Sequence, residues 1–306
     1  MSFRGSHMTV IRVGVIGLGS MGLGMAVSAL KAGLAVTGFD LSAERRKALA
    51  GAGGQVAESL PLLVEEADIV VSVVVNAAQT EAVLFGDQGV AETMPEGAVF
   101  ISCATMAPKR AAEMAARLEA GGRHYLDAPM SGGTTGANAG ALTFMASGSP
   151  DAFERAEPAL QAMGEKIYRL GDAAGRGSSM KLINQLLVGV HIAAAGEAMA
   201  MAAKLGLDLE EVYEVISNSA GASWAFCDRV PSILSGDYSP KSAVSIFTKD
   251  LGIVLDTARA EGFPAPLAGN ALQAYLMAEA AGMAGDNDSS VVRVYAKLAG
   301  LDLPQS

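Results

Sequence analysis

The stretch Arg12-Val-Gly-Val-Ile-Gly-Leu-Gly-Ser-Met-Gly22 decides the fold of this chain. An apolar run over 12–16 leads directly into Gly17-Leu18-Gly19-Ser20-Met21-Gly22, and a helical pattern continues to Gly33. Glycines at this spacing mean little alone, but between a strand and a helix they are typical of a dinucleotide-binding turn. We expect Gly17 to make the tight turn, Gly19 to let the backbone approach a pyrophosphate, and Gly22 to let helix and strand pack closely.

An acidic residue ends the second predicted strand. Residues 35–39 form an apolar run, and Asp40 follows it, eighteen residues after Gly22. A carboxylate here accepts hydrogen bonds from ribose hydroxyls and repels a 2′-phosphate; Arg45 and Arg46 come only a turn into the next helix. We therefore expect NAD rather than NADP, with its pyrophosphate at the helix N-terminus. A glycine turn that binds no nucleotide is the alternative.

Strand and helix patterns alternate through the first half of the chain. Residues 68–75 are mostly β-branched, and shorter apolar runs follow at 98–102, 124–127, 141–147 and 166–170. This alternation predicts a doubly wound, mostly parallel sheet, that is, an α/β Rossmann domain over 9–174. Residues 1–8 contain Gly5-Ser6-His7-Met8 and are typical of an expression-tag remnant.

After Gly175 only helical patterns occur. A long interdomain helix is expected over 178–205, and further helical patterns follow at 208–220, 222–235, 242–262, 266–282 and 288–299. We therefore expect an all-α domain over 175–306. Its apolar helices favour a homo-oligomer, either a dimer or a tetramer.

Composition excludes several classes of protein. The net charge is −10 and no Lys/Arg run occurs, which argues against a nucleic-acid partner. Cys103 and Cys227 are far apart and outside any CxxC motif, so we expect no metal site and two reduced thiols in the cytoplasm. The uncharged stretch 182–196 is shorter than the ~20 apolar residues of a membrane span.

The catalytic group is sought among the residues that remain. His7 lies in the tag, His124 precedes a strand and His191 lies in mid-helix, so no His–Asp pair of the lactate-dehydrogenase kind is evident, and no Tyr-x-x-x-Lys occurs. What remains is the segment Gly175-x-Gly177-x-x-x-Lys181-x-x-Asn184-Gln185, in which the last three share one helix face. A lysine in an apolar helix suits general acid/base catalysis; a lysine that extends its charge into solvent is the alternative.

Four motifs in the right order resemble the β-hydroxyacid dehydrogenase family, which includes 3-hydroxyisobutyrate dehydrogenase and tartronate semialdehyde reductase. They are IGLGSMG at 16–22, Asp127-Ala-Pro-Met-Ser-Gly-Gly133, the segment 175–185, and Phe247-Thr-Lys-Asp-Leu251. The second is similar to the family's substrate motif DAPVSGG, and the fourth to its cofactor-side K-D-L motif. The resemblance covers nearly the whole chain after the tag and implies an NAD-dependent hydroxy acid dehydrogenase with Lys181 as the proton-transfer residue.

Site residues follow from these motifs. The hydroxyl of Ser131 and the main-chain N–H groups of Gly132 and Gly133 can hold a substrate carboxylate. The resemblance places Lys249 near nicotinamide and substrate, with Asp250 orienting it. It also implies cofactor contacts at Val75, Asn76, Thr105 and Phe247.

Some positions depart from the family pattern. Ser102 and Ala104 stand where the family has Asp and Ser, Met130 replaces Val, and Gln185 replaces a second Asn. The last change keeps the amide but lengthens the side chain.

Segments 185–192, 219–224 and 236–244 resemble the L-threonate dehydrogenase branch of the family. They add Ser223 and Trp224 as substrate-binding candidates. The resulting expectation is NAD-dependent oxidation of L-threonate at C2 to 2-oxo-tetronate (2-dehydro-L-erythronate). Action on 3-hydroxyisobutyrate or tartronate semialdehyde, and a nucleotide-sensing binding module without turnover, are the alternatives.

Overall fold

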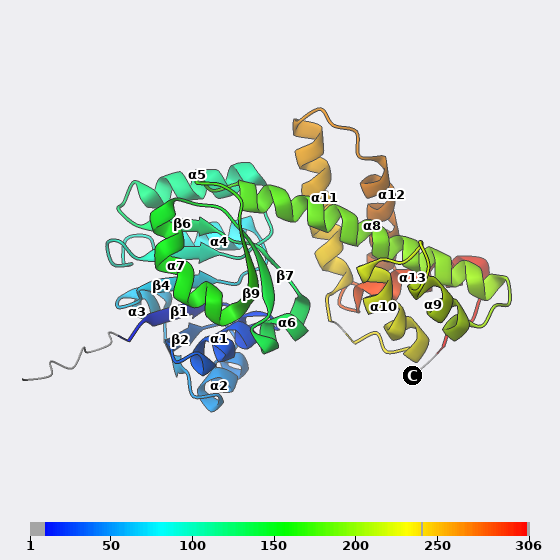
Figure 1. Ribbon diagram of the computed structural model, residues 1–306, viewed down its shortest axis with the longest axis horizontal. Coiled ribbons are helices and arrows are strands. Elements are labelled where there is room, and N and C mark those ends of the chain that lie inside the picture. The colour runs from blue at the N-terminus through cyan, green and yellow to red at the C-terminus, as the bar shows by residue number, and fades with distance from the viewer. Residues whose placement is uncertain (1–9, 240, 305–306) are drawn as a thin grey trace, which may run out of the picture. The chain divides into compact units, whose positions relative to one another are not determined.

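The computed structural model describes residues 10–239 and 241–304 (Figure 1). The predicted tag remnant at 1–8, including His7, lies outside the described residues. The chain divides into two compact units, one ending at Lys181 and the other beginning at Leu182. Every strand formed by the described residues belongs to the first unit.

The first unit is built on a six-stranded sheet of order β3-β2-β1-β4-β5-β6, in which all neighbours are parallel. Its strands are β1 (Arg12–Ile16), β2 (Ala35–Phe39), β3 (Gln55–Val56), β4 (Ile69–Ser72), β5 (Val99–Ser102) and β6 (His124–Asp127). The predicted Rossmann fold is confirmed. The sequence did not reveal β3, because two exposed residues carry no periodic pattern.

Two predicted strands lie in a separate sheet. β8 (Leu142–Ala146) pairs with β7 (Met130–Ser131) in antiparallel fashion and with β9 (Gly164–Arg169) in parallel. Only an isolated bridge between Asp127 and Ser147 joins β6 to the segment after β8. The six-stranded sheet therefore ends at β6, and the last two predicted strands belong to a smaller mixed sheet.

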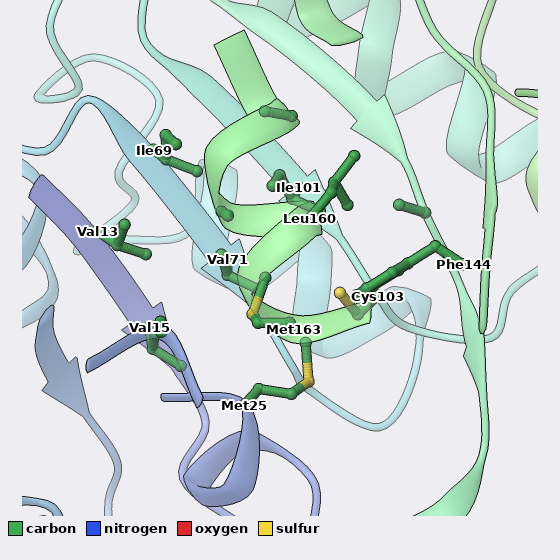
Figure 2. Close-up of a cluster of buried hydrophobic side chains, with 14 of the residues drawn as sticks. Val13, Val15, Met25, Ile69, Val71, Ile101, Cys103, Phe144, Leu160 and Met163 are labelled. Carbon is green, nitrogen blue, oxygen red and sulfur yellow. The ribbon is translucent and has the colours of Figure 1, made fainter. Parts of the chain in front are cut away.

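Helices enclose the large sheet within this unit (Figure 1). They are α1 (Gly22–Lys31), α2 (Ala43–Gly51), α3 (Leu60–Val64), α4 (Ala77–Phe85), α5 (Pro108–Glu119), α6 (Gly133–Ala139) and α7 (Pro150–Met163). Side chains of β4 alternate between two cores: Ile69 and Val71 pack in one, and Val70 packs in the other. Figure 2 shows the first core, where Val13 and Val15 of β1 lie with Met25 of α1 and Met163 of α7. The central strands are thus buried on both faces, as their β-branched sequence predicts.

The secondary-structure elements assigned to the described residues of the second unit are all helices. Helix α8 (Arg176–Lys204) enters it, and α9 (Leu209–Ser217), α10 (Trp224–Ser235), α11 (Val244–Ala260), α12 (Pro266–Ala280), η1 (Asp288–Ser290) and α13 (Val291–Ala299) follow. Length and composition alone would allow α8 to cross a membrane, but 44% of its most apolar window is buried in the protein. A helix in the core of a soluble protein can have the same length and hydropathy.

Candidate active site

The glycine turn connects β1 to α1 at the carboxyl end of the sheet. Gly17 has φ +88°, and a Cβ there would lie 2.6 Å from the carbonyl oxygen of Val73. A Cβ at Gly22 would lie 1.8 Å from the carbonyl oxygen of Gly17. Both glycines are therefore required by the close approach of the chain to itself.

Gly19 differs from its two neighbours in the motif. A Cβ at this position would meet only the Arg45 guanidinium, at 3.7 Å, and nothing else within 4 Å. The protein's own packing does not explain a glycine here, whereas a ligand that passes close to the backbone does. Helix α1 then begins at Gly22, with no side-chain cap from Met21 and no acidic residue in its first turn. The turn therefore fits the pyrophosphate of a dinucleotide.

Asp40 lies beside this turn, directly after β2, and is buried. Its Oδ2 accepts from the main-chain N–H of Leu18 at 2.8 Å, and its Oδ1 accepts from the N–H of Ser42 at 2.8 Å. Burial raises the pKa of Asp40, but these two N–H groups and the nearby Arg45 outweigh it and hold the pKa below its ordinary value. The carboxylate is thus anionic and keeps lone pairs for further donors.

The other predicted cofactor residues of this unit follow neighbouring strands. Val75 and Asn76 lie after β4, and Thr105 lies half-buried after β5. Val75 is exposed, while the side-chain oxygen of Asn76 caps α4 by accepting from the N–H of Gln79 at 2.9 Å. The strand order reverses between β1 and β4, where ligands bind in doubly wound sheets. The structure therefore gathers these residues at the expected edge.

Lys181 lies on the second turn of α8 and is buried, with 8% of its surface exposed. Its Nζ donates to the carbonyl oxygen of Met130 at 2.7 Å. The solvent-extended alternative is therefore wrong for this side chain. A buried lysine that donates to a main-chain carbonyl is a group that can exchange a proton with a neighbouring hydroxyl.

The predicted carboxylate-binding residues follow Met130 immediately. Ser131 ends β7, Gly132 has φ +126°, and Gly133 has φ +60° and begins α6. Their order along the chain puts two main-chain N–H groups and one hydroxyl next to the carbonyl that holds Lys181. Such a set suits a carboxylate.

The sequence did not assign a role to Asp127, which is fully buried at the end of β6. Its carboxylate accepts from Gly175, from Ser178 twice and from Ser147. Burial raises the pKa of Asp127 above its ordinary value, although these donors act in the opposite direction. Burial, with Asp127 nearby, also raises the pKa of Cys103 to about 12, so this thiol stays protonated.

In the second unit, four polar side chains form a continuous chain. Asn184 donates through Nδ2 to Oε1 of Gln185 at 2.9 Å, and Gln185 donates through Nε2 to Oδ2 of Asp250 at 2.5 Å. Asp250 in turn pairs with Lys249. Gln185 is 6% exposed, so its amide links its neighbours and leaves little surface for a ligand.

Three further predicted residues have different surroundings. Phe247 is 3% exposed and stacks on Tyr275 at 5.3 Å between ring centroids, so the structure makes it a core residue of the second unit. Ser223 caps α10 by accepting from the N–H of Phe226 at 3.0 Å. Trp224 is 63% exposed and remains available to a ligand. Among the described residues, no group of three His, Cys, Asp or Glu side chains could hold a metal ion.

Two family models match the chain. The NAD-binding domain of 6-phosphogluconate dehydrogenase matches residues 12–171, and the NAD-binding domain of NADP-dependent 3-hydroxyisobutyrate dehydrogenase matches residues 175–295. Together with the glycine turn and Asp40, these matches define an NAD-dependent oxidoreductase.

Relatives narrow the class. An L-threonate dehydrogenase of Cupriavidus necator is 50% identical over 292 residues, which cover 95% of this chain and 97% of that protein. An L-threonate dehydrogenase of Escherichia coli is 46% identical over 293 residues, covering 95% and 96%. A crystal structure of a 3-hydroxyisobutyrate dehydrogenase from Salmonella typhimurium has a TM-score of 0.88 and 46% identity, covering 93% of this chain and 99% of that one.

The chain belongs to the β-hydroxyacid dehydrogenase family, the 3-hydroxyisobutyrate dehydrogenase-like enzymes. The predicted family and an enzymatic role with NAD as cofactor are confirmed. The alternative of a nucleotide-sensing module without turnover is wrong, because the relatives are named dehydrogenases.

Proposed function

We propose that this chain oxidises L-threonate at C2 to 2-oxo-tetronate, with NAD as the hydride acceptor and Lys181 as general acid/base. The observation that carries the proposal is the buried Lys181, fixed to the carbonyl of Met130 immediately before the Ser131-Gly-Gly133 segment. The names of the relatives that are 44–50% identical support L-threonate as the substrate.

Each residue has a separate task in this mechanism. The substrate carboxylate binds the hydroxyl of Ser131 and the N–H groups of Gly132 and Gly133, which leaves the C2 hydroxyl for Lys181. Lys181 accepts the hydroxyl proton during oxidation, which requires its neutral form, and returns the proton during reduction. Asn184 hydrogen-bonds the substrate from one turn further along α8, and Gln185 holds Asn184 in place.

The cofactor is held by the first unit's strand ends. Residues 17–22, namely Gly17, Leu18, Gly19, Ser20, Met21 and Gly22, hold the pyrophosphate, and Asp40 accepts from the adenosine ribose. Val75, Asn76 and Thr105 line the same edge, and Lys249 acts on the nicotinamide side with Asp250 as its ion-pair partner. NAD, when bound, accepts the hydride from C2. Holding two reactants in line supplies the main rate acceleration.

A second substrate has one observation in its favour. The Salmonella structure with 46% identity is described as a 3-hydroxyisobutyrate dehydrogenase, whereas a 46% identical Escherichia coli relative is named for L-threonate. Tartronate semialdehyde is a third possible substrate for the same chemistry. Initial rates of NADH formation with a panel of hydroxy acids, and of NADH consumption with tartronate semialdehyde, test the proposal. No NADH from L-threonate would contradict it.

We also propose the organisation of the protein. The Rossmann domain comprises residues 9–174, and the helical domain begins at 175 with α8. Two unpaired cysteines support a cytoplasmic location. Exposed apolar side chains of the second unit, such as Met201, Leu205 and Leu298, support a dimer or tetramer, which light scattering at several protein concentrations would test.

A further inference from the structure

The N-terminus of α8 is capped by a residue far away in the sequence. Oδ2 of Asp127 accepts from the main-chain N–H of Gly175 at 2.9 Å and of Ser178 at 2.8 Å, and Oδ1 accepts from the hydroxyl of Ser178 at 2.7 Å. Helix N-termini usually obtain such acceptors from a residue next to the helix in sequence. Here the acceptor lies at the end of β6.

A second side chain completes this attachment. The hydroxyl of Ser147 accepts from the main-chain N–H of Gly177 at 2.9 Å and donates to Oδ2 of Asp127 at 3.4 Å. The main chains of Asp127 and Ser147 also exchange hydrogen bonds of 3.0 and 2.8 Å. A Cβ at Gly177 would lie 2.4 Å from the carbonyl oxygen of Met145 and 2.6 Å from that of Asp127. The first turn of α8 therefore lies directly against the strand ends, where no side chain would fit.

The same short segment touches α8 twice. Asp127 binds the first turn, and three residues later the carbonyl of Met130 accepts from Lys181, one turn further along α8. Ser131 and the two glycines follow Met130 directly. The position of the Lys181 ammonium relative to the proposed carboxylate-binding residues is thus fixed at two points, and one of them is the Asp127 carboxylate.

We propose that Asp127 is a positioning residue for catalysis: by capping α8 it fixes the distance between Lys181 and the residues that hold the substrate carboxylate. This inference rests on the proposed function of Lys181. It assigns Asp127 no contact with substrate or cofactor. A shift of about 1 Å in a reacting group can cost about 10²-fold in rate, which sets the expected effect.

The test is a double-mutant cycle on the full-length enzyme with L-threonate and NAD. We expect Asp127→Ala to lower kcat by about 10²-fold, with the Kd of NAD unchanged within about twofold. In the Lys181→Ala background the same substitution should lower the residual kcat by no more than about twofold, because Asp127 acts only through Lys181. Asp208→Ala is the matched control, since Asp208 caps α9 through two N–H groups at 2.9 Å, and it should leave kcat unchanged.

The outcomes separate the two proposals. An equal loss from Asp127→Ala with and without Lys181 would show a general structural role and overturn the inference, as would full kcat in Asp127→Ala. Full kcat in Lys181→Ala would instead overturn the proposed function itself.

If Asp127→Ala does not fold, two more conservative variants test the positioning role of Asp127. Asparagine can keep an oxygen on the two N–H groups and donate its amide to the hydroxyl of Ser178, which can accept. Asp127→Asn should therefore keep kcat within about threefold, whereas Asp127→Asn with Ser178→Ala should lose about tenfold or more, since the amide then has no acceptor. Equal rates in these two variants would overturn the inference.

Discussion

The ammonium of Lys181 lies 2.7 Å from the carbonyl oxygen of Met130, a hydrogen bond between α8 and the residue before Ser131. The bond lies within the first unit, to which both residues belong. Lys181 is therefore held next to the residues proposed to bind the carboxylate, and the glycine turn for the cofactor lies at a different strand end, after β1. Proton transfer and cofactor binding should respond separately to substitution.

Lys181→Ala should lower kcat by about 10²–10⁴-fold or more, the usual contribution of general acid/base catalysis. The Kd of NAD, measured by fluorescence titration, should be nearly unchanged. Lys204→Ala is the matched control, because Lys204 lies at the other end of α8 and also donates to a main-chain carbonyl, that of Ala299, at 3.0 Å. It should keep full activity. A Lys181→Ala enzyme with most of its kcat would contradict the assignment.

NAD should be preferred to NADP, because the anionic Asp40 repels a 2′-phosphate. Asp40→Ala should narrow the preference for NAD, since it removes the negative charge that repels the 2′-phosphate. It also frees Arg45, which in the unmodified protein lies 3.5 Å from Oδ2 of Asp40, to pair with that phosphate. The ratio of kcat/KM with NAD to kcat/KM with NADP measures the cofactor preference. Asp68→Ala is the control: Asp68 also accepts a main-chain N–H, that of Arg12 at 2.8 Å, but it precedes β4. Equal kcat/KM for both cofactors in the unmodified enzyme would refute the preference.

Asp40 should also make stability depend on pH. Its pKa is lowered in the folded protein, so the stabilisation is fully present above the unfolded-state pKa of about 3.9 and is lost as the pH falls through the folded-state pKa. The difference in Tm between the unmodified protein and Asp40→Asn should therefore shrink as the pH falls below about 4. Calorimetry across this range measures it, and a constant difference would exclude a charged Asp40 as the cause.

A buried ion pair should stabilise the helical unit. The guanidinium of Arg229 donates to both carboxylate oxygens of Asp288, at 2.6 and 3.2 Å, and the Asp288 side chain is fully buried. Asp288→Ala leaves a buried charge without this partner and should cost about 3–5 kcal/mol.

Urea unfolding followed by fluorescence measures this loss specifically, because the chain's one tryptophan, Trp224, lies in the same unit. The control is Asp286→Ala, which breaks a half-exposed pair with Arg293 at 2.8 Å and should cost less than about 1 kcal/mol. Similar losses of unfolding free energy in the two variants would show that burial does not increase the contribution of the Arg229–Asp288 pair to stability.

Local sequence patterns were sufficient to locate the turn and Asp40, because each lies at the end of a strand, whereas Lys181 was singled out only with the help of the family resemblance. Contacts between distant segments could not be predicted. The bond between Gln185 and Asp250 joins residues 65 positions apart, and Asp127 caps a helix that begins 49 residues later in the chain. A capping signal is normally sought in the residues next to a helix.

Phe247 has a contact that the sequence did not predict. The family resemblance implied a cofactor contact for this residue, because it lies in the same motif as Lys249 and Asp250. Helix α11 turns its ring toward Tyr275 in the core, while Lys249 keeps partial exposure. A motif thus fixes the position of a helix but not the face on which each of its residues lies, since successive side chains point in different directions.

L-Threonate should be a better substrate than 3-hydroxyisobutyrate, because it carries hydroxyls on three carbons where the other acid has a methyl branch and one hydroxyl. The hydrogen bonds that each candidate side chain already makes show which groups remain for the additional hydroxyls of L-threonate. Gln185 is committed to Asp250, whereas Asn184, the exposed Trp224 and the hydroxyl of Ser223, which caps α10 as an acceptor and can still donate its proton, remain candidates. The carbonyl oxygen of Asn184 takes no part in its bond to Gln185 and can accept from a substrate hydroxyl.

Sites that hydrogen-bond a substrate hydroxyl discriminate strongly against analogues that lack it, because the protein group is then left unpaired. We expect kcat/KM for L-threonate to exceed that for 3-hydroxyisobutyrate by about 10²-fold or more, with NAD and both acids at equal concentration. Asn184→Ala should reduce that ratio, mainly by slowing the reaction of threonate, whereas Asn218→Ala, at the end of α9, should not. A kcat/KM for 3-hydroxyisobutyrate equal to or above that for threonate would contradict the substrate and leave the family intact, because the glycine turn and Lys181 serve either acid.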